Sequence, residues 1–180
     1  SYTSEYRIEG YLSRMEYNYN DRYYGSVSLR RDGSSKFGTN NKYGNFPSAA
    51  LAWRVLEEDF MKNSHVFSNL KVRLGWGLTG NQEIPDKVSL MSVGTSSNAN
   101  YLTNGILIPG ITFNRTPNPD IKWETTKQIN FGLDFGFLKD RLSGTFDVFS
   151  KATTDVLLQI SSKDPAPTST QWQNVPGLEI

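Results

Sequence analysis

Residue types that support catalysis are sparse in this chain of 180 residues. It has no cysteine and a single histidine, His65, so a thiolate nucleophile is excluded and a Ser/His/Asp triad would have to use a residue in a short connection. Three adjacent carboxylates at 57–59 have apolar neighbours and indicate the solvated first turn of a short helix. The residue types therefore predict that the chain is not an enzyme.

Two further acidic patterns could indicate a catalytic pair or a calcium site, and each also has a purely structural explanation. Asp134 and Asp147 lie on the polar side of two strands joined by a turn at 138–141, so we expect them on neighbouring strands, offset diagonally. A general acid and base also need a defined separation and a substrate pocket, so ion-paired wall residues are the simpler interpretation. The string DGSSK at 32–36 lacks the spaced acids of a calcium loop and predicts a turn. We expect no catalytic residue, metal site or cofactor.

Bulk composition excludes some classes of partner. There are 19 basic and 18 acidic residues, so the chain lacks the positive field that draws proteins to nucleic acid. Mean hydropathy is −0.51, and the absence of a run of about 18 apolar residues argues against a transmembrane helix but not against a transmembrane β-barrel. The chain starts at Ser1 without a leader, so we expect any export signal upstream.

Alternation of apolar and polar residues with a period of two predicts six strands. They cover residues 11–19, 23–30, 46–55, 70–79, 125–137 and 142–153. Residues 56–68 are expected to form a short helical turn and a connector, and Phe149 breaks the rule by falling on a polar position. The chain is therefore predicted to be all-β.

The connections between these strands alternate in length. Short or medium links at 20–22, 56–69 and 138–141 alternate with long segments rich in Gly, Asn, Ser and Pro at 33–45 and 80–122. Tight turns at one end of the strands and long loops at the other are typical of outer-membrane barrels.

Aromatic residues agree with this arrangement. Six of them occupy apolar positions at the strand ends beside the shorter links, where they would make one interfacial girdle: Tyr17, Tyr19, Tyr23, Trp53, Phe135 and Phe137. Trp76, near the other end of its strand, is expected in the second girdle.

A soluble β-sandwich is the alternative, because its strands alternate as well. The pattern here extends over roughly 9–13 residues, near the 9–11 that cross a bilayer and beyond the 5–6 usual in soluble proteins. Six strands are too few to close, since the smallest bacterial barrels have about 8 and a plugged transporter about 22. We therefore predict an antiparallel transmembrane segment of a larger, plugged barrel.

Several strings in the chain resemble the SusC/RagA family of TonB-linked outer-membrane proteins. In family order they are YLSRMEYNYNDRYYGSVSLRRDGSSKFG (11–38), FPSAALAWRV (46–55), NLKVRLGWGLTGNQ (69–82) and NPDIKWETTKQINFGLDFGFLKDRLSGTFDVFSKATTDVLL (118–158). The departures fall mainly at 83–117 and 159–172, where loops are expected.

The resemblance implies an outer-membrane importer of large nutrients, typically glycans or oligopeptides. Such an importer is plugged by an N-terminal domain, covered by a SusD-like surface lipoprotein and energised by TonB. Residues 1–180 would be part of the barrel, and the plug domain and TonB-contacting segment have no counterpart here. A siderophore or cobalamin receptor, a soluble carbohydrate-binding β-sandwich module and an outer-membrane enzyme remain as alternatives.

Two sets of residues are the candidate functional groups. The first comprises polar residues expected to face the lumen and hold the plug: Arg14, Glu16, Arg30, Lys71, Arg73, Asp134 and Asp147. The second comprises aromatic residues in or beside outer loops, whose rings could stack on sugars or peptides: Tyr101, Phe113, Trp123 and Trp172.

Overall fold

The computed structural model describes residues 5–38, 40–62, 66–86, 88–162, 168 and 170–175, without the side chains of 96–98. Its elements are β1 (Ile8–Tyr19), β2 (Tyr23–Ser34), β3 (Tyr43–Arg54), the 3-10 turn η1 (Val55–Glu57), β4 (Phe67–Asn81), β5 (Ser92–Thr103), β6 (Ile106–Arg115), β7 (Glu124–Phe137), β8 (Leu142–Thr154), β9 (Val156–Ser161) and β10 (Thr170–Val175). Within the described residues, no helix is long and apolar enough to cross a membrane.

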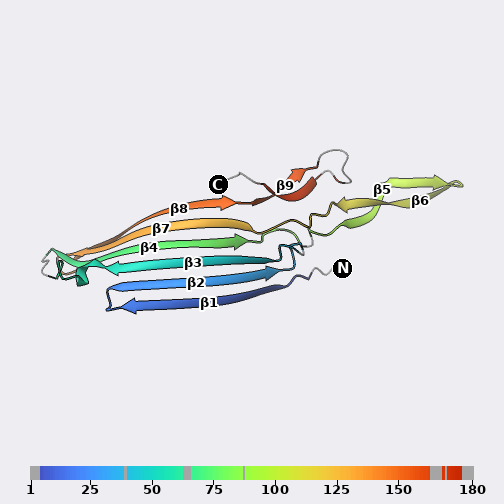
Figure 1. The fold of residues 1–180 in the computed structure, drawn as a ribbon. Helices are drawn as coiled ribbons and strands as arrows, with labels where there is room; N and C mark the ends of the chain where they lie inside the picture. The colour runs from blue at the N-terminus through green and yellow to red at the C-terminus, as the bar shows by residue number, and fades with distance from the viewer. Residues whose placement is uncertain are drawn as a thin grey trace.

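Six long strands form one antiparallel sheet in the order β1-β2-β3-β4-β7-β8 (Figure 1). These are the six strands that the sequence predicts, each extended by one to four residues at one or both ends, except that β3 ends at Arg54, one residue before its predicted end. Asp134 pairs with Thr145 and Asp147 with Gly132, which confirms the diagonal offset of the two carboxylates. The prediction of an all-β antiparallel fold is confirmed.

The connections alternate between the two ends of the sheet as predicted, but one length differs from the prediction. The links β1–β2, β3–β4 and β7–β8 lie at one end, and the segments after β2, β4 and β8 lie at the other (Figure 1). The β3–β4 link, residues 55–66, is longer than the β2–β3 connection, residues 35–42, because β2 and β3 extend into the segment predicted as a long loop. We call these the turn end and the loop end. The tight turns use left-handed backbone at Asn20 and Asp21, and at all three residues of 138–140, whose φ values lie between 53° and 61°.

The apolar face of the sheet is open to its surroundings. Side chains such as Met15, Leu51, Leu74, Ile129 and Phe146 are all exposed on it. A sheet that packs against a second layer would bury these residues, as in a sandwich. A continuous exposed apolar face on long strands is the feature that lipid contact explains.

The predicted aromatic girdle also has a structural counterpart at the turn end. Tyr23 lies 6.4 Å from both Tyr19 and Trp53 between ring centroids, and it stacks on Trp53 with an interplanar angle of 10°. Phe137 lies 4.9 Å from Phe67 and 5.6 Å from Phe135.

Residues 80–122 are not a plain loop, and the expectation of no strand there is wrong. Strands β5 and β6 form a hairpin that projects beyond the loop end of the sheet (Figure 1). Their alternation is hard to recognise because the register shifts between Ser96 and Tyr101. The Asn104-Gly105 turn, with φ of 51° and 77°, was the available sequence signal.

The expectation of a loop at 159–172 also needs correction. Strand β9 pairs with β10 from Val156–Val175 to Ser161–Thr170. Each strand has only six residues, and β10 carries mostly polar residues, so the period-two pattern is too short to be distinctive.

A small hydrophobic core lies at the loop end and joins its connections. Its buried members come from β3 and from the segments after β2, β4 and β8: Phe37, Phe46, Ile84, Val88, Ile121, Trp123 and Leu157. Leu78 and Trp172 pack against this cluster. We call this cluster the loop core. It fixes the bases of the outer connections relative to the sheet.

Candidate functional site: the polar face of the sheet

The polar face of the sheet gathers the charged residues that the alternation assigns to it. Strand pairing aligns Tyr24, Ala52, Arg73, Gly132 and Asp147 in one row across five strands. In the next row, Arg54, Lys71 and Asp134 are neighbours. The sheet therefore brings Lys71, Arg73, Asp134 and Asp147 together, although 76 positions separate the first from the last.

Arg73 is the centre of an ion-pair cluster on this face. Its guanidinium donates two hydrogen bonds to the Asp134 carboxylate, at 2.9 and 2.8 Å, and a third to Asp147 Oδ1 at 3.0 Å. Thr145 donates from its hydroxyl to Asp134 at 3.2 Å. The Arg73, Asp134 and Asp147 side chains are 37%, 23% and 53% exposed. The cluster is thus satisfied within the wall, with Asp147 the partner most open to other groups.

Gly132 makes room for this cluster. A Cβ atom at this position would lie 2.6 Å from Asp147 Oδ1 and 2.7 Å from Arg73 Cζ. The missing side chain allows the guanidinium to cross β7 and reach β8. No single position in the sequence marks this requirement, because it arises only from the register of three strands.

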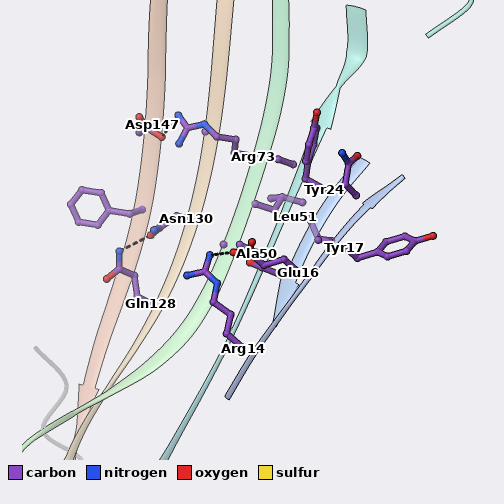
Figure 2. A pocket seen from close by; sticks show the side chains of 18 of the residues that line it. Arg14, Glu16, Tyr17, Tyr24, Ala50, Leu51, Arg73, Gln128, Asn130 and Asp147 are labelled. Atoms are coloured by element: carbon purple, nitrogen blue, oxygen red, sulfur yellow. Dashed lines mark hydrogen bonds and ion pairs between the residues drawn. The ribbon is translucent and has the colours of Figure 1, made fainter. Parts of the chain in front are cut away.

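The centre of the polar face is hollowed. The hollow encloses about 690 Å³ and has small residues on its floor, including Ser26, Ala50, Ala52 and Gly75. Figure 2 shows the Arg14–Glu16 ion pair on β1 at one side and the Gln128–Asn130 hydrogen bond on β7 at the other. The hollow is an open surface that can accept an extended polar partner.

The remaining charged residues of the predicted set have partners of their own. Arg14 contacts Glu16 at 2.6 Å, with both side chains well exposed. Arg30 donates from Nε to Asp32 at 2.8 Å. Lys71 Nζ lies 6.0 Å from the centroid of the Tyr24 ring. All seven residues lie on the polar face, and their lumen-facing role stays a prediction.

Phe149 is an apolar exception on this face. It pairs with Asn130, is exposed, and has Lys151 Nζ 5.5 Å from its ring centroid. Phe149 also borders the hollow, so it offers one apolar contact to whatever lies against the floor.

The four aromatic residues predicted to contact ligand do not form one site. Tyr101 and Phe113 are exposed on the β5–β6 hairpin, whereas the Trp123 ring is buried in the loop core, 4.8 Å from Phe37 and 5.5 Å from Phe46 between centroids. Trp172 packs against that core. The contacts of the two tryptophans are packing contacts, and ligand contact by any of the four stays a prediction.

The string DGSSKFG at 32–38 has a structural role that the sequence did not reveal. Lys36 donates from Nζ to the Ile84 carbonyl at 3.0 Å and lies 3.5 Å from Asp86, while Phe37 enters the loop core. Ser35 exchanges hydrogen bonds with the backbone of Arg7. The string joins the segment before β1 and the segment after β4 to the loop core.

A second polar network lies at the turn end, where Glu58 of the β3–β4 link meets side chains of β2 and β3. Glu58 accepts hydrogen bonds from the Tyr23 hydroxyl and from Trp53 Nε1, and Arg22 lies 3.4 Å away. The bonds from Tyr23 and Trp53 hold the pKa of the Glu58 carboxyl below its ordinary value. Glu58 thereby joins the girdle to the β3–β4 link. His65 lies outside the described residues.

The part of the chain that the structure describes contains no group of three or more His, Cys, Asp or Glu side chains placed to hold a metal ion. The polar face is a surface of ion pairs and amides that can bind and orient a partner.

An exposed apolar face, a hollowed polar face and a turn end opposite a loop end together describe the wall of an outer-membrane β-barrel. The sequence matches the family described as TonB dependent receptor-like, beta-barrel, over residues 2–179. The chain belongs to this family of outer-membrane proteins.

Individual relatives place it with the SusC/RagA type. It is 37% identical to the TonB-dependent receptor SusC of Bacteroides thetaiotaomicron, over 99% of the chain and 18% of SusC. It is 36% identical to the TonB-dependent receptor P26 of Formosa agariphila, over 98% of the chain and 18% of P26. The solved RagAB peptide importer in the 'open-open' state is similar with a TM-score of 0.84 at 31% identity, over 96% of this chain and 18% of that one. The chain thus spans about a fifth of the length of these relatives.

Proposed function

We propose that this chain is part of the wall of a TonB-dependent channel that imports large nutrients, glycans or oligopeptides, across the outer membrane. The observation that carries the proposal is the sheet with one apolar and one polar face, matched over nearly its whole length by the receptor family. Transport rather than catalysis fits a polar face whose charged groups are paired with one another.

In this proposal the polar face lines the lumen. Its hollow, bordered by Arg14, Glu16, Arg73 and Asp147, lies against a plug domain formed by another part of the protein. The exposed Asp147 and the Arg14–Glu16 pair present charges to the plug, whereas the Arg73–Asp134 contact keeps the wall rigid. In this proposal TonB contacts another, N-terminal part of the protein.

The solute class is inferred from the relatives. One solved relative is a peptide importer, and the similarity to SusC extends over 99% of the chain. The exposed rings of Tyr101 and Phe113 can stack on either sugars or peptide side chains. A SusD-like surface lipoprotein closes the channel mouth in this proposal.

Growth experiments with the full-length protein test the import function. A deletion strain should lose growth on one class of oligosaccharide or oligopeptide as sole nutrient, and the full-length gene should restore it. Removal of TonB should abolish growth on the same solute in the complemented strain. Undiminished growth of the deletion strain on every glycan and peptide mixture supplied would contradict import of these nutrients.

A further inference from the structure

Charged residues are rare on the apolar face of the sheet, and they gather near one end of it. In the six long strands, all of whose residues the structure describes, strand parity places only Glu9, Arg31 and Lys127 on this face. Each lies within three residues of the loop end of its strand. The rest of the apolar face therefore carries no charge.

The two cations, Arg31 and Lys127, lie at the outer boundary of the apolar band. In outer-membrane barrels this band is about 25 Å tall, and the tight turns face the periplasm. Arg31 is eight positions from Tyr23 of the girdle, and Lys127 is ten positions from Phe137. At about 3.4 Å per residue and a tilt of about 40°, these stretches rise about 21 and 26 Å along the membrane normal. Both cations therefore reach the headgroups of the outer leaflet.

Arg31 has no anionic partner in the described part of the chain. Its Cζ atom lies 4.8 Å from the centroid of the Tyr43 ring, which holds the guanidinium on this face. Tyr43 donates its hydroxyl to Glu9, and no ion pair joins Glu9 to Arg31. The N–H groups of the guanidinium thus remain available to a group outside these residues.

Two uncharged hydrogen-bond donors flank Arg31. Tyr11 and Asn45 lie directly opposite it on the two neighbouring strands, and all three side chains are exposed. Among the described residues, neither the Tyr11 hydroxyl nor the Asn45 amide has a hydrogen-bond partner. Adjacent strands are about 4.8 Å apart, so the three groups can donate to one tetrahedral oxyanion such as a phosphate. We call Tyr11, Arg31 and Asn45 the donor row.

Lys127 supplies a second positive charge at a similar depth. It lies three strands from Arg31 in the sheet, roughly 14 Å at about 4.8 Å per strand. Its strand neighbours Leu78 and Ala152 are apolar, and no described residue forms an ion pair with its ammonium group. The outer leaflet of an outer membrane consists mainly of a glycolipid whose headgroup carries phosphate. Unpaired cations at headgroup depth complement that charge.

We propose that the donor row and Lys127 bind the phosphorylated headgroup of this outer-leaflet glycolipid, lipopolysaccharide. Arg31 contacts a phosphate directly, Tyr11 and Asn45 donate to its other oxygens, and Lys127 attracts a second phosphate of the same leaflet. The site lies on the lipid side of the wall and does not depend on what the channel imports.

Native mass spectrometry of the delipidated, full-length receptor in detergent tests the site. The probes are lipid A, which is the phosphorylated anchor of lipopolysaccharide, the same lipid A after removal of its phosphates, phosphatidylglycerol, and inorganic phosphate. We expect wild type to bind lipid A at least about tenfold more tightly than the dephosphorylated form. Inorganic phosphate at millimolar concentration should not displace it.

A matched pair of arginine variants locates the contact. Arg31→Gln should bind lipid A about tenfold more weakly than wild type and should bind dephosphorylated lipid A unchanged. Arg141→Gln removes the same charge at the turn end and should bind both lipids as wild type does. Each variant must run as the same heat-modifiable band as wild type. If Arg31→Gln does not fold, Tyr11→Phe, which removes one exposed hydroxyl, should weaken lipid A binding about threefold.

Glu9→Gln tests the charge of the site while keeping its shape. Glutamine can still accept the Tyr43 hydroxyl, so the Tyr43 ring stays beside Arg31, but the one negative charge on this face is removed. Affinity for lipid A at low ionic strength should therefore rise about two- to threefold. An unchanged or lower affinity would contradict a phosphate bound beside Arg31.

Four further outcomes would overturn the proposal. Equal binding of lipid A and its dephosphorylated form would exclude phosphate recognition, and equal losses in Arg31→Gln and Arg141→Gln would exclude this location. Tighter binding of phosphatidylglycerol than of lipid A would assign the site to an ordinary phospholipid. Displacement of lipid A by inorganic phosphate would assign it to a free anion.

Discussion

Arg73 joins three strands of the wall with a single side chain. It holds Asp134 through two hydrogen bonds and Asp147 through one, from β4 across β7 to β8. The two contacts are unequal, because a paired guanidinium–carboxylate fork is stronger than a single contact and because Asp134 is the less exposed carboxylate.

Asparagine substitutions should separate these two contacts. We expect Asp134→Asn to lower the free energy of unfolding of the full-length barrel by about 1.5–3 kcal/mol, and Asp147→Asn by less than about 1 kcal/mol. Urea unfolding in lipid vesicles, followed by tryptophan fluorescence, measures both. Equal losses would show that both contacts contribute equally to the free energy of unfolding and that our ranking of them is wrong.

Glu58 gives the turn end a dependence on pH. Hydrogen bonds from Tyr23 and Trp53 lower the pKa of Glu58 from its ordinary value of 4.5. A carboxyl whose pKa is lower in the folded state stabilises the fold fully above that ordinary value, and the contribution disappears as pH falls through the lowered pKa.

Glu58→Gln should therefore be less stable than wild type at pH 7, and the difference should narrow once the pH drops below about 4. The unfolding midpoint of the full-length protein, measured from pH 3 to pH 7, checks this. Glu16→Gln, an exposed carboxylate on the polar face, is the control. A difference that does not change with pH would mean that the charge of Glu58 is irrelevant.

At the scale of elements, the loop core fixes the outer connections to the sheet. Phe37 is almost completely buried between Trp123 and its other neighbours, although it lies in a connection between two strands. Loops this well packed are not the flexible links that a Gly- and Ser-rich sequence suggests.

Phe37→Ala should loosen this packing. Truncation of a buried phenylalanine costs about 3–5 kcal/mol, so we expect residues 35–42 to become cleavable by protease on intact cells while the barrel keeps its heat-modifiable band. Phe149→Ala, which removes an exposed ring from the polar face, should not change cleavage. Protection of the loop in Phe37→Ala would exclude a structural role for the loop core.

Strands with a long and regular alternation of apolar and polar residues were predicted from the sequence, and strands with an interrupted alternation were missed. Leu70 to Thr79 alternate without a fault, so β4 was recognised, whereas the shift between Ser96 and Tyr101 concealed β5. The polar positions of Arg73, Asp134 and Asp147 were predictable from parity. Their joint contact was not, because it depends on strand register and on the space left by Gly132.

Burial of Trp123 could not be predicted for a similar reason. Its partners Phe37 and Phe46 lie about 80 positions earlier, and no local pattern connects them. An aromatic residue beside a loop fits packing and ligand contact equally well until the contacts are known.

For the molecule as a whole, the two faces of the sheet should respond oppositely to charge. Leu51 and Ala52 are adjacent on β3 but point to the apolar and polar faces. We expect Leu51→Arg to destabilise the full-length barrel in lipid bilayers by about 2–4 kcal/mol, and Ala52→Arg to be tolerated far better. Folding into vesicles at increasing urea concentration compares them. A larger loss for Ala52→Arg would reverse the assignment of the two faces.

The two edge strands of the sheet determine how this part of the wall can associate with other strands. Among the described residues, strands β1 and β8 each have a partner on one side only, and unpaired edges of this length invite association with other chains. A closed wall therefore needs strands beyond the six in this sheet, in agreement with relatives about five times as long.

The loop core also constrains the order in which the barrel assembles. The turns at the turn end join strands that are adjacent in sequence, so they can form early, whereas the loop core includes Phe37 and Leu157, which are 120 positions apart. The loop core at the loop end cannot pack completely until β7 and the segment after β8 have folded onto the sheet. Pairing of the strands thus starts at the tight turns, and packing of Leu157 into the loop core marks the completion of this part of the barrel.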